Sequence, residues 1–328
     1  MDPLAIPPPM QTLFADLAQQ VATAPIAGSV YRRSRDGIEY LYAKLPVGNE
    51  RVDRFIGKAD DPEAVARAEE MRVGAALMKQ RRRIVSMLRN GGLPGPNRTL
   101  GAILDAIAHA GLFRDGAILI GTAAYLISGP VVGYRLPAPT LMTGDLDLAT
   151  TSLLLGADPP ERFEAILRRA DPSFAGVMPL NRGALPSRFR NAQGYLVDLV
   201  TPQLRRSDTN PMPVTGLGAG ATPLHHLAWL LEDPIPTIAL WGGGVAVTIP
   251  QPHRFAVHKL ILAQRRDPAN RLKRFKDLAQ AKALIDAFLR HDRFALIDAL
   301  DDARARGKRG WAEPIDRSLA ELGFTADL

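Results

Sequence analysis

The sequence predicts an α/β fold of the α+β type, in which a small mixed sheet is flanked by helices. From residue 97 onward, short apolar runs typical of buried strands alternate with segments of helical periodicity. Before them, residues 28–58 alternate apolar and charged side chains as an antiparallel meander does. After residue 254 the pattern is helical throughout. We therefore expect an N-terminal β-meander with a helix, a central α/β layer and a C-terminal helical domain.

The composition is that of a globular protein with room for more than one domain. The 328 residues are 46% hydrophobic and 23% charged, and a chain of this length exceeds one core of typical size. No run reaches the roughly 20 apolar residues of a membrane helix, and the first residues lack a secretory signal pattern. The absence of cysteine excludes disulfides and thiolate metal sites. We expect a cytoplasmic protein with no membrane partner, and the net charge of +7 favours a polyanionic one.

The N-terminal part is predicted to divide into an arm and a basic unit. Residues 1–27 carry several prolines and only a short helical pattern, which suggests an arm. Residues 28–58 are the meander, and 61–90 form a helix that ends before a Pro- and Gly-rich connector, so the basic unit spans 28–96. Its basic side chains, which favour RNA or tRNA as a partner, are Arg32, Arg33, Arg35, Lys44, Arg51, Arg54, Lys79, Arg81, Arg82 and Arg83.

The remaining chain is predicted to form two further units, 97–204 and 205–328. The first contains helix 100–110, strand 117–120, helix 123–128, a strand at 145–148, helix 159–170 and strand 195–202. The second opens with a Gly- and Pro-rich loop at 205–223. It continues with a helix over LHHLAWLLE, a strand over GVAVTIP and two or three helices from residue 254, so it is mostly helical.

Two aspartates stand in an apolar strand in the stretch TGDLDLAT. Side chains two residues apart in a strand share a face, so Asp145 and Asp147 point the same way. Carboxylates so placed repel each other unless a cation lies between them, and their oxygens suit Mg²⁺ or Mn²⁺. Asp198 occupies a similar apolar strand, LVDLV. If that strand lies beside the first, the three aspartates can hold metal ions for phosphoryl chemistry.

A tight strand-to-helix turn precedes the aspartates in ILIGTAAYLIS. Gly121 lets backbone amides approach a phosphate, the helix N-terminus favours negative charge, and the Thr122 hydroxyl can donate to a phosphate oxygen. The pair therefore predicts a nucleotide-binding turn.

Taken together, these motifs resemble the DNA polymerase beta-like nucleotidyltransferase superfamily, whose signature is a Gly followed by Gly or Ser and then a strand Asp-x-Asp. The resemblance spans about residues 28 to 290. Within the superfamily, the chain is similar to bacterial stand-alone members that are related to abortive-infection and toxin-type proteins. It implies a nucleotidyltransferase fold, with 97–204 as the catalytic domain. It also implies Mg²⁺-dependent transfer of a nucleotidyl group from an NTP such as ATP to a hydroxyl, with release of pyrophosphate.

The resemblance assigns roles residue by residue. Asp145, Asp147 and Asp198 would be catalytic and bind the metal, and Gly121 and Thr122 would bind the nucleotide. Two further nucleotide-binding positions on the helical part match the family's lysine and Lys-Asp pair, namely Lys259 and Asp277, which follows Lys276. Two departures are visible, because Thr122 stands in place of Gly or Ser and the 24 positions from Gly121 to Asp145 exceed the spacing in compact members.

Other interpretations of the same residues remain open. A non-catalytic binding or antitoxin-like module could keep the fold without turnover, and a glycosyltransferase could use an Asp-x-Asp for Mn²⁺. Lys259 could be a surface lysine, and Asp277 a surface partner of a basic neighbour. The acceptor could be a small molecule or a protein hydroxyl instead of RNA.

Overall fold

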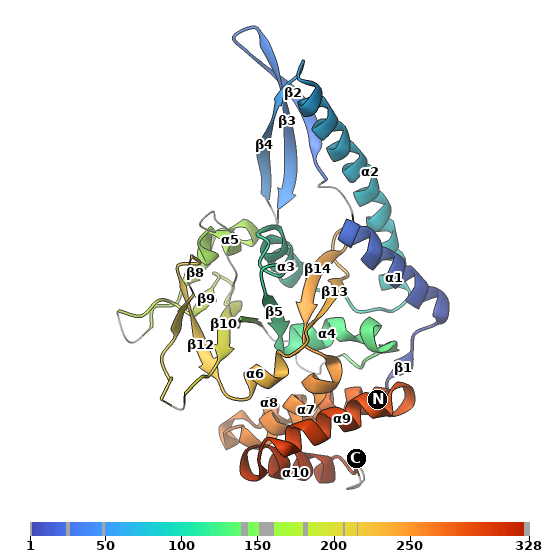
Figure 1. Cartoon of the computed structure of the whole chain (residues 1–328), viewed down its shortest axis with the longest axis vertical. Helices are drawn as coiled ribbons and strands as arrows, with labels where there is room; N and C mark the ends of the chain where they lie inside the picture. The colour runs from blue at the N-terminus through green and yellow to red at the C-terminus, as the bar shows by residue number, and fades with distance from the viewer. Residues whose placement is uncertain are drawn as a thin grey trace.

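The computed structural model describes residues 2–23, 27–47, 50–138, 144–150, 161–179, 183–205, 207–214 and 216–324. In Figure 1 the molecule consists of a projecting unit at the top, a central α/β layer and a group of helices at the bottom, where both termini lie. The mixed α/β class predicted from the sequence is confirmed. No helix in these ranges is long and apolar enough to cross a membrane.

The projecting unit, called the wing below, is made of strands β2 (Ser29–Arg35), β3 (Ile38–Val47) and β4 (Glu50–Lys58) with the first half of helix α2 (Pro62–Asn90). The strands form an antiparallel sheet in the order β2-β3-β4, as the alternating pattern predicts. Asp61 caps α2 by accepting a hydrogen bond from the amide of Glu63. Six buried side chains join sheet and helix into a small core: Leu41, Ala43, Ile56, Ala64, Ala68 and Met71.

The first residues form regular elements. Strand β1 (Leu4–Ala5) pairs with β6 (Tyr134–Arg135), and helix α1 (Pro8–Thr23) runs against the second half of α2. The sequence predicts only a short helical pattern here, but α1 has 16 residues. It forms because Phe14 and Leu17 are buried in a second core with side chains from α2 and from strand β13 (Ile235–Ala239).

The central sheet has seven strands, and five of them lie in the order β11-β12-β10-β7-β5. Strands β7 (Asp145–Thr150), β10 (Leu196–Pro202) and β12 (Ala219–Leu224) run parallel, whereas β5 (Ala117–Ile120) is antiparallel to β7 and β11 (Met212–Val214) is antiparallel to β12. Two short strands, β8 (Ala175–Gly176) and β9 (Arg188–Arg190), extend the sheet beside β10. Helices of this layer are α3 (Arg98–His109), α4 (Gly121–Val132) and α5 (Phe163–Ala170).

Two predicted elements between residues 205 and 250 are wrong. The expected loop at 205–223 contains β11 and most of β12, and the expected helix over LHHLAWLLE is reduced to α6 (Leu227–Leu230). The helix cannot start earlier because Leu224 still pairs in β12 and His226 has a left-handed φ of 62°. The predicted strand over GVAVTIP is confirmed as β14 (Val245–Ile249), which forms a hairpin with β13.

The C-terminal helices complete the main core. They are α7 (Pro252–Arg265), α8 (Arg271–His291), α9 (Arg293–Ala305) and α10 (Glu313–Glu321), with short turns η1 (Pro268–Asn270) and η2 (Lys308–Ala312) between them. One continuous apolar cluster runs from α3 and the central sheet into these helices. The helical group therefore does not have a core of its own. Helices α7 and α8 pack against α4, and residues of both line one cavity with the aspartates of the sheet.

Candidate functional site

The two aspartates of β7 point away from the core. Leu146 and Leu148 are buried on the opposite face, so the period of the strand leaves Asp145 and Asp147 together on the other one. Strand β10 runs parallel to β7 in a register that pairs Asp147 with Asp198. Residues paired in this way point to the same face of a sheet, and all three aspartates line one cavity of about 540 Å³.

Burial and neighbouring carboxylates both act on the ionisation of Asp147. Burial and, to a lesser extent, the neighbouring carboxylates of Asp145 and Asp198 together raise the pKa of Asp147 to about 6, although Lys259 and Lys273 lower it in part. Among the residues that the structure describes, no basic side chain forms an ion pair with Asp145 or Asp147. Negative charge is thus left without a direct partner at this point of the cavity.

Asp198 differs from the other two because it already has a partner. Both of its oxygens accept hydrogen bonds from the guanidinium of Arg188, Nε and Nη2 each at 2.7 Å. Arg188 lies on β9, which runs antiparallel to β10 and pairs the two residues directly. Within the described ranges no three His, Cys, Asp or Glu side chains are grouped closely enough to hold a metal ion.

The glycine at the start of α4 touches this acidic face. Gly121 has a left-handed φ of 67°, and a Cβ atom at that position would lie 2.4 Å from Oδ2 of Asp147. Only glycine allows both the backbone conformation and the close approach. Helix α4 has no side-chain cap at its N-terminus, so the amides of its first turn have no intrahelical partner, and Gly121 and Thr122 of this turn line the cavity.

Opposite the aspartates, α7 and α8 contribute a buried ion-pair cluster. Lys259 donates to Asp277 at 2.7 Å, and Arg266 donates to the other oxygen of Asp277 at 2.8 Å. Lys259 is 5% exposed and Asp277 is fully buried. Burial alone would raise the pKa of Asp277, but Lys259 and Arg266 outweigh burial and lower it. Asp277 therefore holds Lys259 in place, and the surface interpretation of both residues is wrong.

The sequence reasoning missed several residues that line this cavity. Arg188 could have been found, because it and Asp198 lie three residues before and after the turn Asn191–Tyr195, as cross-strand partners do. His226 and His258 also line the cavity, and burial lowers the pKa of the first to about 4 and of the second to about 3. His226 precedes α6 and His258 lies on α7, so their positions depend on the packing of α6 against α7, which no local pattern predicts.

Comparison with known proteins places these residues in a family. A family model described as nucleotidyltransferase matches residues 98–305, which is more than half of the chain. Searches of curated proteins and of solved structures found no match. Every residue that lines the 540 Å³ cavity, from Ile120 to Asp277, falls inside the matched span. The chain therefore belongs to a family of nucleotidyltransferases.

Proposed function

We propose that this protein is a metal-dependent nucleotidyltransferase of the DNA polymerase beta-like type, which moves a nucleotidyl group from an NTP to an acceptor hydroxyl and releases pyrophosphate. The observation that carries the proposal is the joint placement of two unpaired carboxylates, a glycine-started helix and a fixed lysine around one cavity. A triphosphate with its cation needs these three kinds of group at once.

The carboxylates suit a divalent cation such as Mg²⁺ or Mn²⁺. Asp145 and Asp147 share a face, offer only oxygen, and have no ion-pair partner among the described residues, so their mutual repulsion favours a cation between them. A cation held by Asp145 and Asp147 would supply positive charge to balance that of the triphosphate and of the departing pyrophosphate. Asp198 would become the third carboxylate of the site once Arg188 gives up at least one of its hydrogen bonds to it. The freed oxygen of Asp198 would then accept the proton of the acceptor hydroxyl.

The nucleotide phosphates are proposed to lie between α4 and α7. The free amides of the first turn of α4 and the Thr122 hydroxyl donate to phosphate oxygens, and Gly121 keeps the backbone close. Lys259 supplies a positive charge whose position is set by Asp277. Lys273 and Lys276 line the same cavity and add to that charge.

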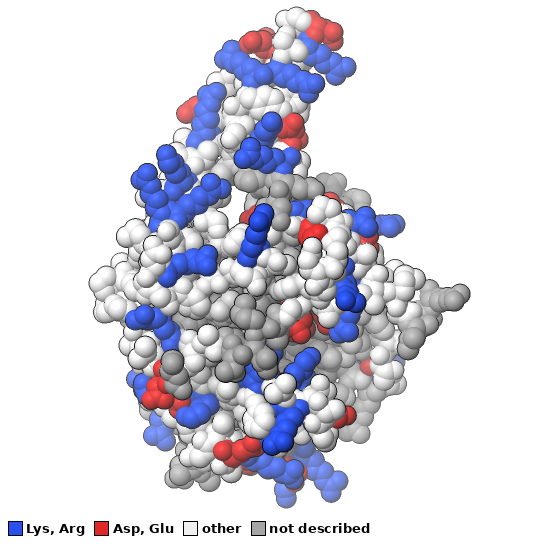
Figure 2. Space-filling model, turned by 180° about the vertical axis from the view of Figure 1, so that it is seen from behind, with Lys and Arg blue, Asp and Glu red and all other residues white. Residues whose placement is uncertain are grey.

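RNA, for example a tRNA end, is the acceptor that we favour. Lys and Arg side chains cover much of the wing on the face seen in Figure 2. The sheet of the wing exposes aromatic rings as well, since Tyr31 stacks on Tyr42, Phe55 is 56% exposed, and Lys44 lies 5.5 Å from the centre of the Tyr31 ring. Basic groups with exposed rings are the usual means of holding phosphates and unpaired bases.

One observation favours a second candidate, a non-catalytic binding module. Arg188 occupies both oxygens of Asp198, as it would if the third carboxylate had lost its role in turnover. Such a module would bind an NTP but would not transfer it.

The test is incubation of the protein with each α-labelled NTP, Mg²⁺ and total cellular RNA, followed by identification of the molecule that acquires label. We expect label in RNA with the wild-type protein and none with Asp145→Asn. The matched control is Asp298→Asn, an exposed aspartate on α9, which should transfer label normally. Equal label transfer by Asp145→Asn would contradict the assignment, and NTP-dependent thermal stabilisation without any transfer would favour the non-catalytic module.

A further inference from the structure

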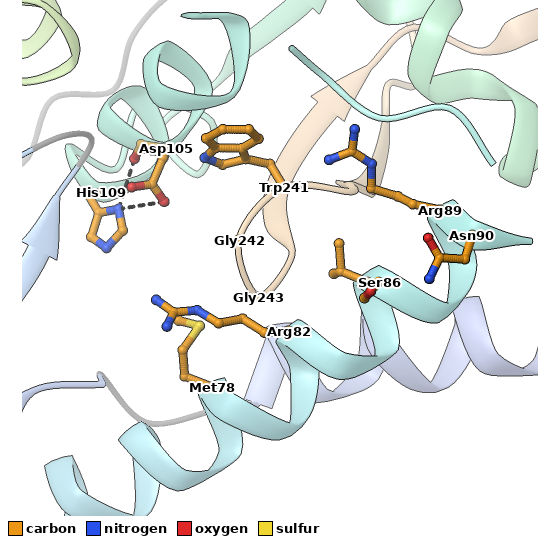
Figure 3. Close-up of a pocket in the computed structure, with 11 residues that line it drawn as sticks. Met78, Arg82, Ser86, Arg89, Asn90, Asp105, His109, Trp241, Gly242 and Gly243 are labelled. Atoms are coloured by element: carbon orange, nitrogen blue, oxygen red, sulfur yellow. Dashed lines mark hydrogen bonds and ion pairs between the residues drawn. The ribbon is translucent and has the colours of Figure 1, made fainter. Parts of the chain in front are cut away.

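A second cavity, called the wing cavity below, lies away from the aspartates at the base of the wing, where α2 continues towards the central layer. It has a volume of about 740 Å³ and is bounded by the second half of α2, by α3 and by the turn of the β13–β14 hairpin. Figure 3 shows Arg82 and Arg89 reaching into this space from α2, with Trp241 and His109 on the opposite side. None of the residues that line it lines the 540 Å³ cavity of the aspartates, which is called the catalytic cavity below after its proposed role.

The two arginines are the unusual feature of this cavity. They are seven residues apart, which places them on one side of α2 about 10 Å from each other. Both are exposed, and among the described residues neither has a hydrogen bond or an ion pair with another side chain. The only carboxylate lining the cavity is that of Asp105, which is engaged by His109 at 3.4 Å. The cavity therefore carries positive charge that the protein itself does not balance.

Three glycines allow side chains that line the cavity to pack directly against backbone. A Cβ atom on Gly101 would lie 2.1 Å from the Trp241 ring, so the indole rests flat on the backbone of α3. The stem of Arg89 lies over Gly95 in the same way, with Nε 2.9 Å from such an atom. Gly243 of the hairpin turn packs against the sulfur of Met78. The Trp241 ring and the stem of Arg89 thus pack closely against backbone, which limits their movement before a ligand binds.

We propose that this cavity is a second binding site, which holds a single-stranded segment of RNA. The guanidinium groups of Arg82 and Arg89 form bidentate hydrogen bonds with backbone phosphates. A base stacks on the exposed part of the half-buried Trp241 ring. Ser86 and Asn90 supply neutral hydrogen bonds along the same wall. Because the arginines, Ser86 and Asn90 are all exposed, the site is open along its length and suits a strand that passes through it.

The identification of this strand as the acceptor rests on the proposed function, whereas the binding itself does not. The experiment therefore measures binding without turnover. A fluorescently labelled single-stranded RNA of about 12 nucleotides, a length typical of one such site, is titrated with the full chain and followed by fluorescence anisotropy. Arg82→Ala with Arg89→Ala is compared with Lys79→Ala with Arg83→Ala, which removes the same charge from exposed positions of the same helix outside the cavity.

We expect the Arg82/Arg89 double variant to weaken RNA binding at least about tenfold and the Lys79/Arg83 variant less than about threefold. Trp241→Phe, which keeps a ring on Gly101, should give an intermediate loss. Equal losses in both double variants would show non-specific attraction and overturn the proposal. It would also fall if AMP bound as tightly as the strand, or if polyglutamate competed with RNA as well as unlabelled RNA does.

Two controls separate this proposal from the proposed function. Asp145→Asn should bind the RNA as the wild type does, although it transfers no label. The Arg82/Arg89 variant should keep its thermal stabilisation by NTP with Mg²⁺. Loss of RNA binding in Asp145→Asn would mean that the catalytic cavity holds the strand, and the proposed second site would be wrong even if label transfer were observed.

Discussion

The two cavities of this protein balance their charges in different ways. In the catalytic cavity, the protein pairs Lys259 and Arg266 with Asp277. Asp145 and Asp147 have no ion-pair partner among the described residues, and neither do Lys273 and Lys276, so unpaired groups of both signs line this cavity. In the wing cavity, the one carboxylate is engaged and two arginines remain without partners in the described structure. Unpaired groups of both signs suit a ligand such as a triphosphate with its cation, whereas unpaired arginines alone suit a polyanion.

The largest effect on stability is expected from the paired charges of the catalytic cavity. Asp277→Ala leaves Lys259 buried without its partner, which should lower the free energy of unfolding by about 3–5 kcal/mol. The matched control is Asp286→Ala on the same helix, whose partner Lys282 is 46% exposed; that change should cost at most about 0.5 kcal/mol. Urea unfolding measures both, and equal costs would show that the buried cluster does not support the fold.

The next effect concerns the glycine that touches Asp147. Gly121→Ala and Gly133→Ala lie at the two ends of α4 and have similar left-handed φ values of 67° and 76°. Each should lose about 1–2 kcal/mol of stability from backbone strain. Only Gly121→Ala meets Asp147 at 2.4 Å, whereas the nearest atom to a Cβ at Gly133 is 3.6 Å away. We expect label transfer to be lost in Gly121→Ala alone, and retained activity there would contradict the proposed phosphate position.

His258 in the catalytic cavity and His109 in the wing cavity should affect the free energy of unfolding in opposite directions as pH changes. Burial lowers the pKa of His258 to about 3, and the neighbouring Lys259 and His226 contribute. The unfolded chain protonates near pH 6.5, so His258 makes the fold less stable as pH falls from 6.5 towards 3, by at most about 1.4 kcal/mol per pH unit. The hydrogen bond with Asp105 raises the pKa of His109 instead. Protonated His109 therefore stabilises the fold fully below pH 6.5, and this stabilisation is lost as pH rises through the raised pKa of His109.

Urea unfolding between pH 5 and pH 8 would test these signs with His258→Leu and His109→Gln. The first substitution should flatten the loss of stability on the acid side. The second should remove a smaller loss on the alkaline side, because the His109 side chain is 38% exposed. If both substitutions altered the pH dependence of the free energy of unfolding in the same direction, the contrast between the cavities would be contradicted.

The smallest effect is expected in the wing cavity. Arg82→Ala and Arg89→Ala remove exposed cations that stabilise nothing within the described chain, so each should change the free energy of unfolding by no more than about 0.5 kcal/mol. A loss of several kcal/mol would mean that these arginines serve the fold and not a ligand.

The sequence predicted the acidic strands well because the evidence there is local. An aspartate among apolar strand residues stands out in both TGDLDLAT and LVDLV, and the parallel register of β7 and β10 then brings Asp147 beside Asp198. The same holds for the wing, whose alternation and turn residues mark its strands. Assignment of roles to these residues rests on the resemblance and remains a prediction.

What the sequence could not predict depends on distant partners. Strand β12 has the composition of a loop, AGATPL, and becomes a strand only because β10 offers it a free edge. Strand β13 contains Pro236 yet pairs with β14. The wing cavity is formed by α2, α3 and a hairpin turn from residue 241, so no single stretch of the sequence carries its pattern.

Helix α2 belongs to two different cores along its 29 residues. Ala64, Ala68 and Met71 pack only into the six-residue core of the wing, whereas Ile84, Val85 and Leu88 pack with α1 and β13. Local opening costs least where few apolar contacts are lost, so backbone amides of α2 should exchange with solvent deuterium fastest near residue 65 and slowest near residue 88. The helix thus joins a wing that can open by itself to a body that stays closed.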